Sequence, residues 1–379
     1  MDACVAAPRV SVVVPVYNAE RWLGQRLDSL LGQTLRELEV ICVDDGSSDA
    51  SPRILADAAA RDPRVRVVHQ RNAGPAAARN RGLELARGTY VTAMDADDYC
   101  DRGLLAGVMS AIDASRRLVD VAVFPERSHN EATGADVDLG YAFQSWRFPR
   151  EAFTWESDPD HIFTSFQNWL HNKLFRTAFV RENDLRLQDL HHTEDLLFTC
   201  SALVLAQGIL CVPGPSAVYR IGVPGTQLHA TQRYPLDFYA ACVGLHDFLQ
   251  ARGIMGRLRR GYVSWVADCV CSNVDLMGDP VGMRRIYETL HDGGLAELGL
   301  DDASPDDYLA EEPFPDHRRR IERIARGGFD AFVVGENRDN FERWHEEHER
   351  LLAVENSRSF RLGRAITSLP RRLRDTLSR

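Results

Sequence analysis

The chain has 379 residues, a formal net charge of −10 and 44% hydrophobic residues. That length is too great for one small core, so we expect two or more packed units in a globular protein. The acidic balance argues against a nucleic-acid-binding protein, because phosphate binding requires a basic face.

The first hundred residues alternate strand and helix signals. Short β-branched or apolar runs predict strands at residues 10–14, 39–43, 65–69 and 89–94. Helical patterns separate them at 18–31, with Asn18 as N-cap, at 51–61 and at 75–87. This alternation predicts an α/β fold with an open, mostly parallel sheet flanked by helices.

The rest of the chain is predicted to contain two more strands and to be mainly helical from about residue 235. The patterns indicate a helix at 103–117, a strand at 119–124 and irregular structure at 125–160. Helical patterns dominate from 163 to about 208, and a short strand follows at 217–221. Residues from about 235 to 352 are mainly helical, with a loop at 301–316. We therefore expect a helical C-terminal region beyond the sheet.

Polar clusters follow three of the four early strands. They are Tyr17-Asn18, Asp44-Asp45 and Asp95-Ala96-Asp97. In parallel sheets, ligands bind beyond the carboxyl ends of the strands, so these clusters predict one binding site.

The pair Asp95 and Asp97 offers hard oxygen ligands for Mg²⁺ or Mn²⁺ beside a diphosphate. A calcium loop starting at Asp95 would need glycine at its sixth position and glutamate at its twelfth, and the chain has Cys100 and Ala106 there. In the second cluster, Asp45 can accept a hydrogen bond from a base N–H or a ribose hydroxyl, although a helix-capping role is the alternative.

Five motifs occur in a fixed order. They are Pro15-Val16-Tyr17-Asn18, Asp44-Asp45-Gly46-Ser47-Ser48-Asp49, Asn72-Ala73-Gly74-Pro75 continuing to Gly82, Gly88-Thr89-Tyr90-Val91, and Asp95-Ala96-Asp97-Asp98. Over about the first 100 residues this set resembles the bacterial family 2 glycosyltransferases. The resemblance implies a GT-A fold and inverting transfer, usually from a UDP-sugar, with Mn²⁺ or Mg²⁺.

The resemblance also implies roles for single residues. The nucleotide pocket would be lined by Pro15, Tyr17, Asn18, Asp44, Asp45, Gly74, Arg79, Asp95 and Ala96, and the metal would be held by Asp97 and Asp95. Among these, Asp45 is expected to recognise uracil.

A second set of motifs resembles the acceptor half of these enzymes. It comprises Asn172-Lys173-Leu174-Phe175-Arg176 and Thr193-Glu194-Asp195-Leu196. The resemblance makes Asp195, beside Glu194, the general base that inversion requires; the alternative is a carboxylate that stabilises a helix N-terminus. Acceptor or phosphate contacts are expected from Lys173, His192 and Arg220, although the loop after Arg220 lacks the serine of the family pattern.

The predicted organisation has three parts. Residues 1–230 form the GT-A domain, with a nucleotide-binding half at 8–101 and an acceptor half at 102–230; residues 231–355 form a helical region and 356–379 a basic amphipathic tail. Seven arginines against one acidic residue in 357–379 predict attachment to an anionic membrane surface, with packing on the acidic body as the alternative.

Localisation follows from composition. None of the eight cysteines forms a Cys-x-x-Cys pair, residues 1–9 are too short and polar for a signal peptide, and no apolar run approaches the roughly 20 residues that span a bilayer. We expect a cytoplasmic protein at the inner face of the membrane.

The sequence therefore predicts a metal-dependent inverting glycosyltransferase, of hexosyltransferase type, acting on a glycan or lipid-linked acceptor of the cell envelope. The alternatives are a nucleotidyltransferase and a non-catalytic sugar-nucleotide-binding protein.

Overall fold

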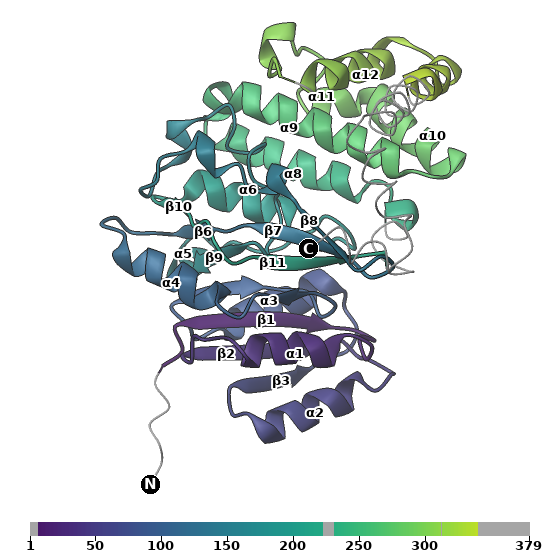
Figure 1. Ribbon diagram of the computed structural model, residues 1–379. Helices are drawn as coiled ribbons and strands as arrows, with labels where there is room; N and C mark the ends of the chain where they lie inside the picture. The colour runs from purple at the N-terminus through teal and green to yellow at the C-terminus, as the bar shows by residue number, and fades with distance from the viewer. Residues whose placement is uncertain (1–6, 223–230, 312, 340–379) are drawn as a thin grey trace, which may run out of the picture. The chain divides into compact units, whose positions relative to one another are not determined.

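The computed structural model describes residues 7–222, 231–311 and 313–339 (Figure 1). The chain divides into two compact units, residues 1–318 and 319–379. Every candidate site residue named above lies in the first unit.

A seven-stranded sheet with the order β10-β6-β9-β4-β1-β2-β3 forms the centre of the first unit. Its strands are Ile209–Cys211 (β10), Val121–Val123 (β6), Lys173–Arg176 (β9), Tyr90–Ala93 (β4), Val10–Val16 (β1), Leu38–Asp44 (β2) and Val65–His69 (β3). All pairs are parallel except those of β9, which runs antiparallel to both β4 and β6. The predicted α/β class and mostly parallel sheet are confirmed.

Strand β9 lies within residues 163 to about 208, where mainly helical structure was predicted. Its four residues are too few to show a strand period in the sequence. They become a strand because Leu174 and Phe175, both fully buried, insert between β4 and β6.

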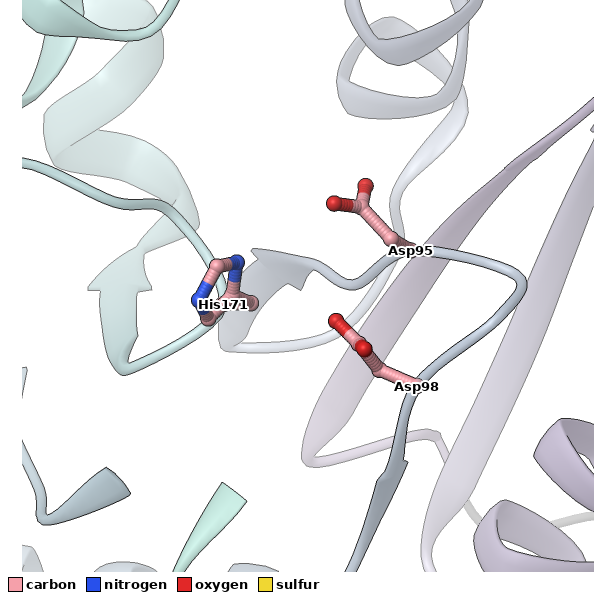
Figure 2. A group of neighbouring side chains, drawn as sticks. All are labelled: Asp95, Asp98 and His171. Atoms are coloured by element: carbon pink, nitrogen blue, oxygen red, sulfur yellow. The ribbon is translucent and has the colours of Figure 1, made fainter. Parts of the chain in front are cut away.

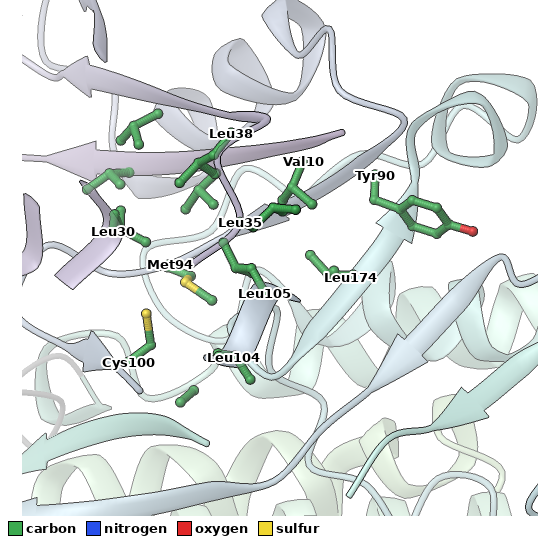
Figure 3. Packing of buried hydrophobic residues seen from close by; sticks show 14 of the residues in the cluster. Val10, Leu30, Leu35, Leu38, Tyr90, Met94, Cys100, Leu104, Leu105 and Leu174 are labelled. Atoms are coloured by element: carbon green, nitrogen blue, oxygen red, sulfur yellow. The ribbon is translucent and has the colours of Figure 1, made fainter. Parts of the chain in front are cut away.

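Helices cover both faces of this sheet. They are Leu23–Leu31 (α1), Ser51–Arg61 (α2), Pro75–Leu85 (α3) and Leu104–Ala114 (α4). Val10, Val12 and Val14 of β1 share one apolar core with leucines of α1, α2 and α4, part of which is drawn in Figure 3. On the opposite face Val13 meets α3, where a Cβ added to Gly82 would lie 2.1 Å from Val13 Cγ1. The helix α3 can approach β1 because residue 82 is glycine.

Helix α1 begins four residues later than predicted. Its N-cap is Trp22, and Asn18 instead adopts a left-handed backbone with φ of 49°. Asn18 Oδ1 accepts a hydrogen bond of 2.8 Å from Ser48 N. Asn18 therefore ties the loop after β1 to the loop after β2 and does not cap a helix.

A second sheet has the order β5-β11-β7-β8, with strands Tyr99–Cys100, Ala217–Ile221, Glu126–Asn130 and Ala135–Asp138. The predicted strand at 217–221 is confirmed. Strands β7 and β8 lie where irregular structure was predicted, because neither has an apolar run. Short 3₁₀ turns follow at Gly140–Ala142 (η1), Ser145–Arg147 (η2) and Trp155–Ser157 (η3).

Helices dominate the remaining described residues, as predicted. They are Thr177–Glu182 (α5), Leu196–Leu205 (α6), Asp237–Ala251 (α8), Met255–Leu276 (α9), Pro280–Thr289 (α10), Leu295–Glu297 (α11) and Phe314–Arg326 (α12), with short turns at Leu290–Gly294 (η4) and Pro305–Asp307 (η5). Helix α8 packs on both α6 and α9. Among the described helices, none combines the length and the apolar composition that crossing a bilayer requires. The basic tail at 356–379 lies outside the described residues.

Candidate functional site

The loops after β1 and β2 lie side by side, because Pro15 and Val16 pair with Val43 and Asp44 in the parallel register. Tyr17 is 55% exposed at this edge of the sheet. Asp44 is buried. Its Oδ1 accepts a hydrogen bond of 3.1 Å from Ser47 N, and its Oδ2 lies 2.8 Å from His69 Nδ1. Its carboxylate therefore stabilises its own turn and the end of β3.

Asp45 organises the loop that leads into α3. Its Oδ1 accepts hydrogen bonds from Gln70 Nε2 at 2.8 Å and Ala73 N at 2.9 Å, and its Oδ2 accepts one from Gly74 N at 2.8 Å. Gly74 has φ of +91°, which explains the glycine at this position. These bonds shape the wall of the predicted nucleoside pocket, and recognition of uracil by Asp45 stays a prediction.

Arg79 of α3 bridges two loops that are far apart in the sequence. Its Nη2 donates to Asp95 Oδ1, after β4, and its Nη1 donates to Glu194 Oε1, before α6. Burial would lower the pKa of Arg79, but the two carboxylates outweigh it and raise that pKa. Burial would likewise raise the pKa of Asp95, but Arg79 and then His171 lower it, so Asp95 is ionised.

Asp95, Asp98 and His171 converge next to this bridge, as Figure 2 shows, and each offers a ligand atom within 4.8 Å of the others. His171 Nε2 lies 3.0 Å from Glu126 Oε2. Burial disfavours the protonated ring, yet Glu126 and the two aspartates raise the pKa of His171 to about 9. This group of side chains therefore attracts positive charge.

The same three residues fit a divalent cation. Asp98 Oδ2 is buried and has no hydrogen-bond partner among the described residues. Burial, followed by the charge of Asp97, raises the pKa of Asp98. Carboxylate oxygens and an imidazole nitrogen are donors that Mn²⁺ accepts.

Asp97, the expected metal ligand, does not belong to this group. Its carbonyl oxygen accepts a hydrogen bond of 2.6 Å from Arg220 Nε, and burial followed by the charge of Asp95 raises the pKa of its side chain. Ligation by Asp97 stays a prediction. The sequence analysis missed Asp98, which follows the Asp-x-Asp pair directly, and His171, which immediately precedes the Asn172-Lys173 motif.

The loop before α6 presents Glu194 and Asp195. Thr193 adopts a left-handed backbone with φ of 58°, a conformation that costs a residue with a side chain about 1–2 kcal/mol. Backbone strain of this kind is concentrated at functional sites. Asp195 is the N-cap residue of α6, but its side chain makes no capping hydrogen bond. The geometry thus gives little support to the alternative of a purely helix-stabilising carboxylate.

Asp195 also has the protonation behaviour of a base. Burial and the neighbouring charge of Glu194 raise its pKa to about 7, against the lowering effect of Arg79 and His171. A carboxylate with a pKa near 7 is well matched to proton transfer at neutral pH.

A cavity of about 1020 Å³ connects these groups. Its wall includes three residues from the predicted donor site or next to it, Pro75, Arg79 and Asp95. Glu194 and Asp195 also line it. The wall continues over residues of the acceptor half and of the helical region, among them Tyr141, Trp169, His171, His192, Asp268 and Glu311. Residues 15–18 and 44–45, which are predicted to bind the nucleoside, are not part of this wall.

His192, an expected acceptor contact, lines this cavity. Its Nε2 lies 3.1 Å from Thr231 Oγ1, and its backbone N donates to Asp237 Oδ2 at 3.0 Å. Burial lowers the pKa of its ring. His192 is therefore held in place by Thr231 and by Asp237 of helix α8.

Lys173 and Arg220 do not line the cavity. Lys173 is fully buried, and its Nζ donates to the carbonyl oxygens of Gln167 and Trp169 and to Asn172 Oδ1. Burial lowers its pKa to about 7. These bonds fix the loop that carries His171, and the expected contact of Lys173 with acceptor or phosphate has no geometric support.

Arg220 is only 3% exposed. Its Nη2 donates to Gln25 Oε1 at 2.8 Å, and its guanidinium carbon lies 4.0 Å from the centre of the Trp22 ring. Since Arg220 N also donates to Asp98 Oδ1 at 2.9 Å, this residue holds the loop of acidic residues after β4.

Comparison with known proteins agrees with the arrangement of these elements. Residues 11–179 match the family model described as "Glycosyl transferase family 2". EpsH of Bacillus subtilis (strain 168), named as a glycosyltransferase, is 29% identical over 302 residues, which cover 76% of this chain and 83% of EpsH. The "Succinoglycan biosynthesis protein ExoO" of Rhizobium meliloti (strain 1021) is 32% identical over 224 residues, covering 56% of this chain and 60% of ExoO.

Among solved structures, residues 1–349 of S. aureus TarS in complex with UDP-GlcNAc align with a TM-score of 0.49 and 21% sequence identity, covering 84% of this chain and 91% of that chain. The family match confirms the family that the ordered motifs predicted. Residues 11–179 are therefore a glycosyltransferase family 2 domain.

Proposed function

We propose that this enzyme is a metal-dependent inverting glycosyltransferase that moves a sugar from a UDP-sugar to a hydroxyl of a glycan or lipid-linked acceptor in cell-surface polysaccharide biosynthesis. The observation that carries the proposal is the bridge of Arg79 between Asp95 and Glu194, which brings the donor edge and Asp195 into one cavity. The relative ExoO, named for succinoglycan biosynthesis, supports the polysaccharide context.

In this proposal Asp195 is the general base. The acceptor oxygen forms a bond to the anomeric carbon while the bond from that carbon to the diphosphate oxygen breaks, and the hydroxyl proton passes to the Asp195 carboxylate. UDP leaves with the electron pair of the broken bond. Arg79 and His192 border the same cavity, so they limit where the donor sugar and the acceptor can lie.

Asp95, Asp98 and His171 would hold the divalent cation, with Asp97 as the further candidate from the sequence. When bound, the cation would neutralise charge on the departing diphosphate. Arg79 keeps Asp95 ionised, and Arg220 holds the backbone around Asp97 and Asp98.

A panel of nucleotide sugars tests this function without knowledge of the acceptor. With Mn²⁺ we expect slow release of UDP from at least one UDP-sugar, and loss of this release on addition of EDTA. Tight UDP binding without any turnover would favour a non-catalytic role. Formation of a UDP-sugar from UTP and a sugar 1-phosphate would instead identify a nucleotidyltransferase.

Attachment to an anionic membrane surface through residues 357–379 is a separate proposal, since this segment lies outside the described residues. Deleting it should lower the fraction of enzyme that partitions onto phosphatidylglycerol vesicles. An unchanged fraction would rule out the segment as an anchor.

A further inference from the structure

We propose that the part of the cavity lined by Tyr141 and Asp268 binds an uncharged carbohydrate chain, and that these two residues recognise sugar units beyond the one that reacts. This inference rests on the proposed function and specifies its acceptor. The two residues come from different parts of the first unit, Tyr141 from η1 and Asp268 from α9, and both line the same cavity as Asp195.

The size of the cavity indicates an acceptor longer than one sugar. Pockets that enclose a drug-sized ligand measure roughly 300–1,000 Å³, and this cavity measures about 1020 Å³. Residues 15–18 and 44–45, which are predicted to bind the nucleoside, do not line it, so this volume is left for the donor sugar and the acceptor. Because Asp195 and Asp268 line the same cavity, a chain whose hydroxyl reaches Asp195 could also contact α9.

The accessible lining combines aromatic rings with neutral polar groups. Tyr141 is 54% exposed, and Trp169 is partly exposed in the same wall. Gln144, Thr164, Gln167 and Ser272 supply amides and hydroxyls. A sugar ring has apolar C–H faces and a polar rim of hydroxyls, so it matches a surface where aromatic faces and hydrogen-bonding groups alternate.

Asp268 supplies a carboxylate for sugar hydroxyls. Its side chain is 42% exposed, and its Oδ1 lies 3.7 Å from His317 Nδ1. Carboxylates accept hydrogen bonds only, which suits a ligand rich in O–H donors. An ionised Asp268 also repels a carboxylate or phosphate on the bound unit.

Arg147, which lines the cavity, is already paired. Glu311 Oε1 accepts from Arg147 Nη2 at 3.1 Å and lies 2.9 Å from His161 Nε2. An anionic sugar would have to compete with Glu311 for Arg147 while approaching Asp268. The charges therefore favour an uncharged chain over a uronate-bearing or phosphate-bearing one.

The chain offers matched controls for both residues. Trp146 is 71% exposed and only five positions from Tyr141, the side chain of Asp247 on α8 is 76% exposed, and neither residue lines the cavity. We therefore compare Tyr141→Ser with Trp146→Ser, and Asp268→Asn with Asp247→Asn. All four variants should bind UDP with the wild-type affinity, because none of the four residues belongs to the predicted nucleoside pocket.

Transfer is measured with Mn²⁺ and the UDP-sugar identified above on an array of immobilised oligosaccharides that includes neutral, uronate-bearing and phosphate-bearing chains. We expect wild-type transfer to neutral chains of two or more units, a KM for the acceptor raised about tenfold or more in Tyr141→Ser and Asp268→Asn, and changes within about twofold in the controls. Transfer only to anionic chains, transfer to none of the chains, or equal effects in test and control variants would overturn the inference. Loss of UDP-sugar hydrolysis in the wild type would instead count against the proposed function.

Discussion

Replacing Arg79 with methionine should destabilise the first unit, because it leaves two partly buried carboxylates without their shared cation. The side chains of Arg79, Asp95 and Glu194 are 13%, 30% and 10% exposed. Removing one partner of a buried ion pair costs about 3–5 kcal/mol. Since Asp95 retains some contact with water, we expect the lower end, about 3 kcal/mol. Arg79→Lys should cost about half of this, because one ammonium does not match the fork of two carboxylates.

Urea unfolding at equal m-values measures this loss. Arg81→Met is the control: Arg81 lies on the same helix, its side chain is 50% exposed, and it pairs at 3.5 Å with Glu84. Exposed pairs contribute roughly 0–1 kcal/mol, so the control should stay within that range.

The pH dependence supplies a second signature of the Arg79 bridge. In the wild type Arg79 helps lower the pKa of Asp95, so this pair stabilises the fold above the ordinary pKa of aspartate and loses that effect as pH falls through the folded value. Without Arg79 the pKa of Asp95 should rise, and protonation then removes the uncompensated charge. The stability gap between Arg79→Met and wild type should therefore narrow from pH 7 to pH 5. A loss equal to that of Arg81→Met, or a gap that does not change with pH, would refute the reasoning.

Three further predictions address the base and the packing. Asp195→Asn should lower kcat for transfer by roughly 10²–10⁴-fold and leave UDP affinity unchanged in calorimetry; wild-type turnover in this variant would exclude Asp195 as base. Because the base must be ionised and its pKa is raised to about 7, kcat for the wild type should rise about tenfold per pH unit below 7 and level off above it, whereas a flat profile between pH 5 and 7 would contradict the assignment. Gly82→Ala should cost about 1–3 kcal/mol in urea unfolding, since the new methyl group would meet Val13 at 2.1 Å, while Gly24→Ala on α1, with nothing within 4 Å, should stabilise by about 0.5–1 kcal/mol.

Much of the first hundred residues could be predicted from sequence, because each parallel strand there is a continuous apolar run and each helix has a clear period. The loops at the strand ends could be located because they lie between these strands and helices. The start of α1 was wrong because Asn18, a good helix cap by residue type, uses its side chain to join two loops. Asn18 can cap a helix or accept a hydrogen bond from Ser48. Which of the two occurs depends on the position of Ser48 in the fold, and the sequence around Asn18 does not specify that position.

The acceptor side was harder to predict. Strands β7 and β9 are short or polar and form only because they pair with strands distant in sequence. The convergence of His171 with Asp95 and Asp98 depends on β9 lying next to β4, so residue spacing could not reveal it. The sequence likewise predicted that Lys173 contacts the acceptor or a phosphate. In the fold, its Nζ instead donates hydrogen bonds to three oxygen atoms of the protein.

We propose that UDP binds at the edge of the sheet after β4 and that its binding requires a divalent cation. Calorimetric titration of the enzyme with UDP, with Mn²⁺ and with EDTA, tests it most directly. We predict binding with Mn²⁺ that weakens at least about tenfold with EDTA and that is weakened in the same way by Asp98→Asn in the presence of Mn²⁺. Absence of UDP binding, or equal affinity with and without the cation, would contradict the account.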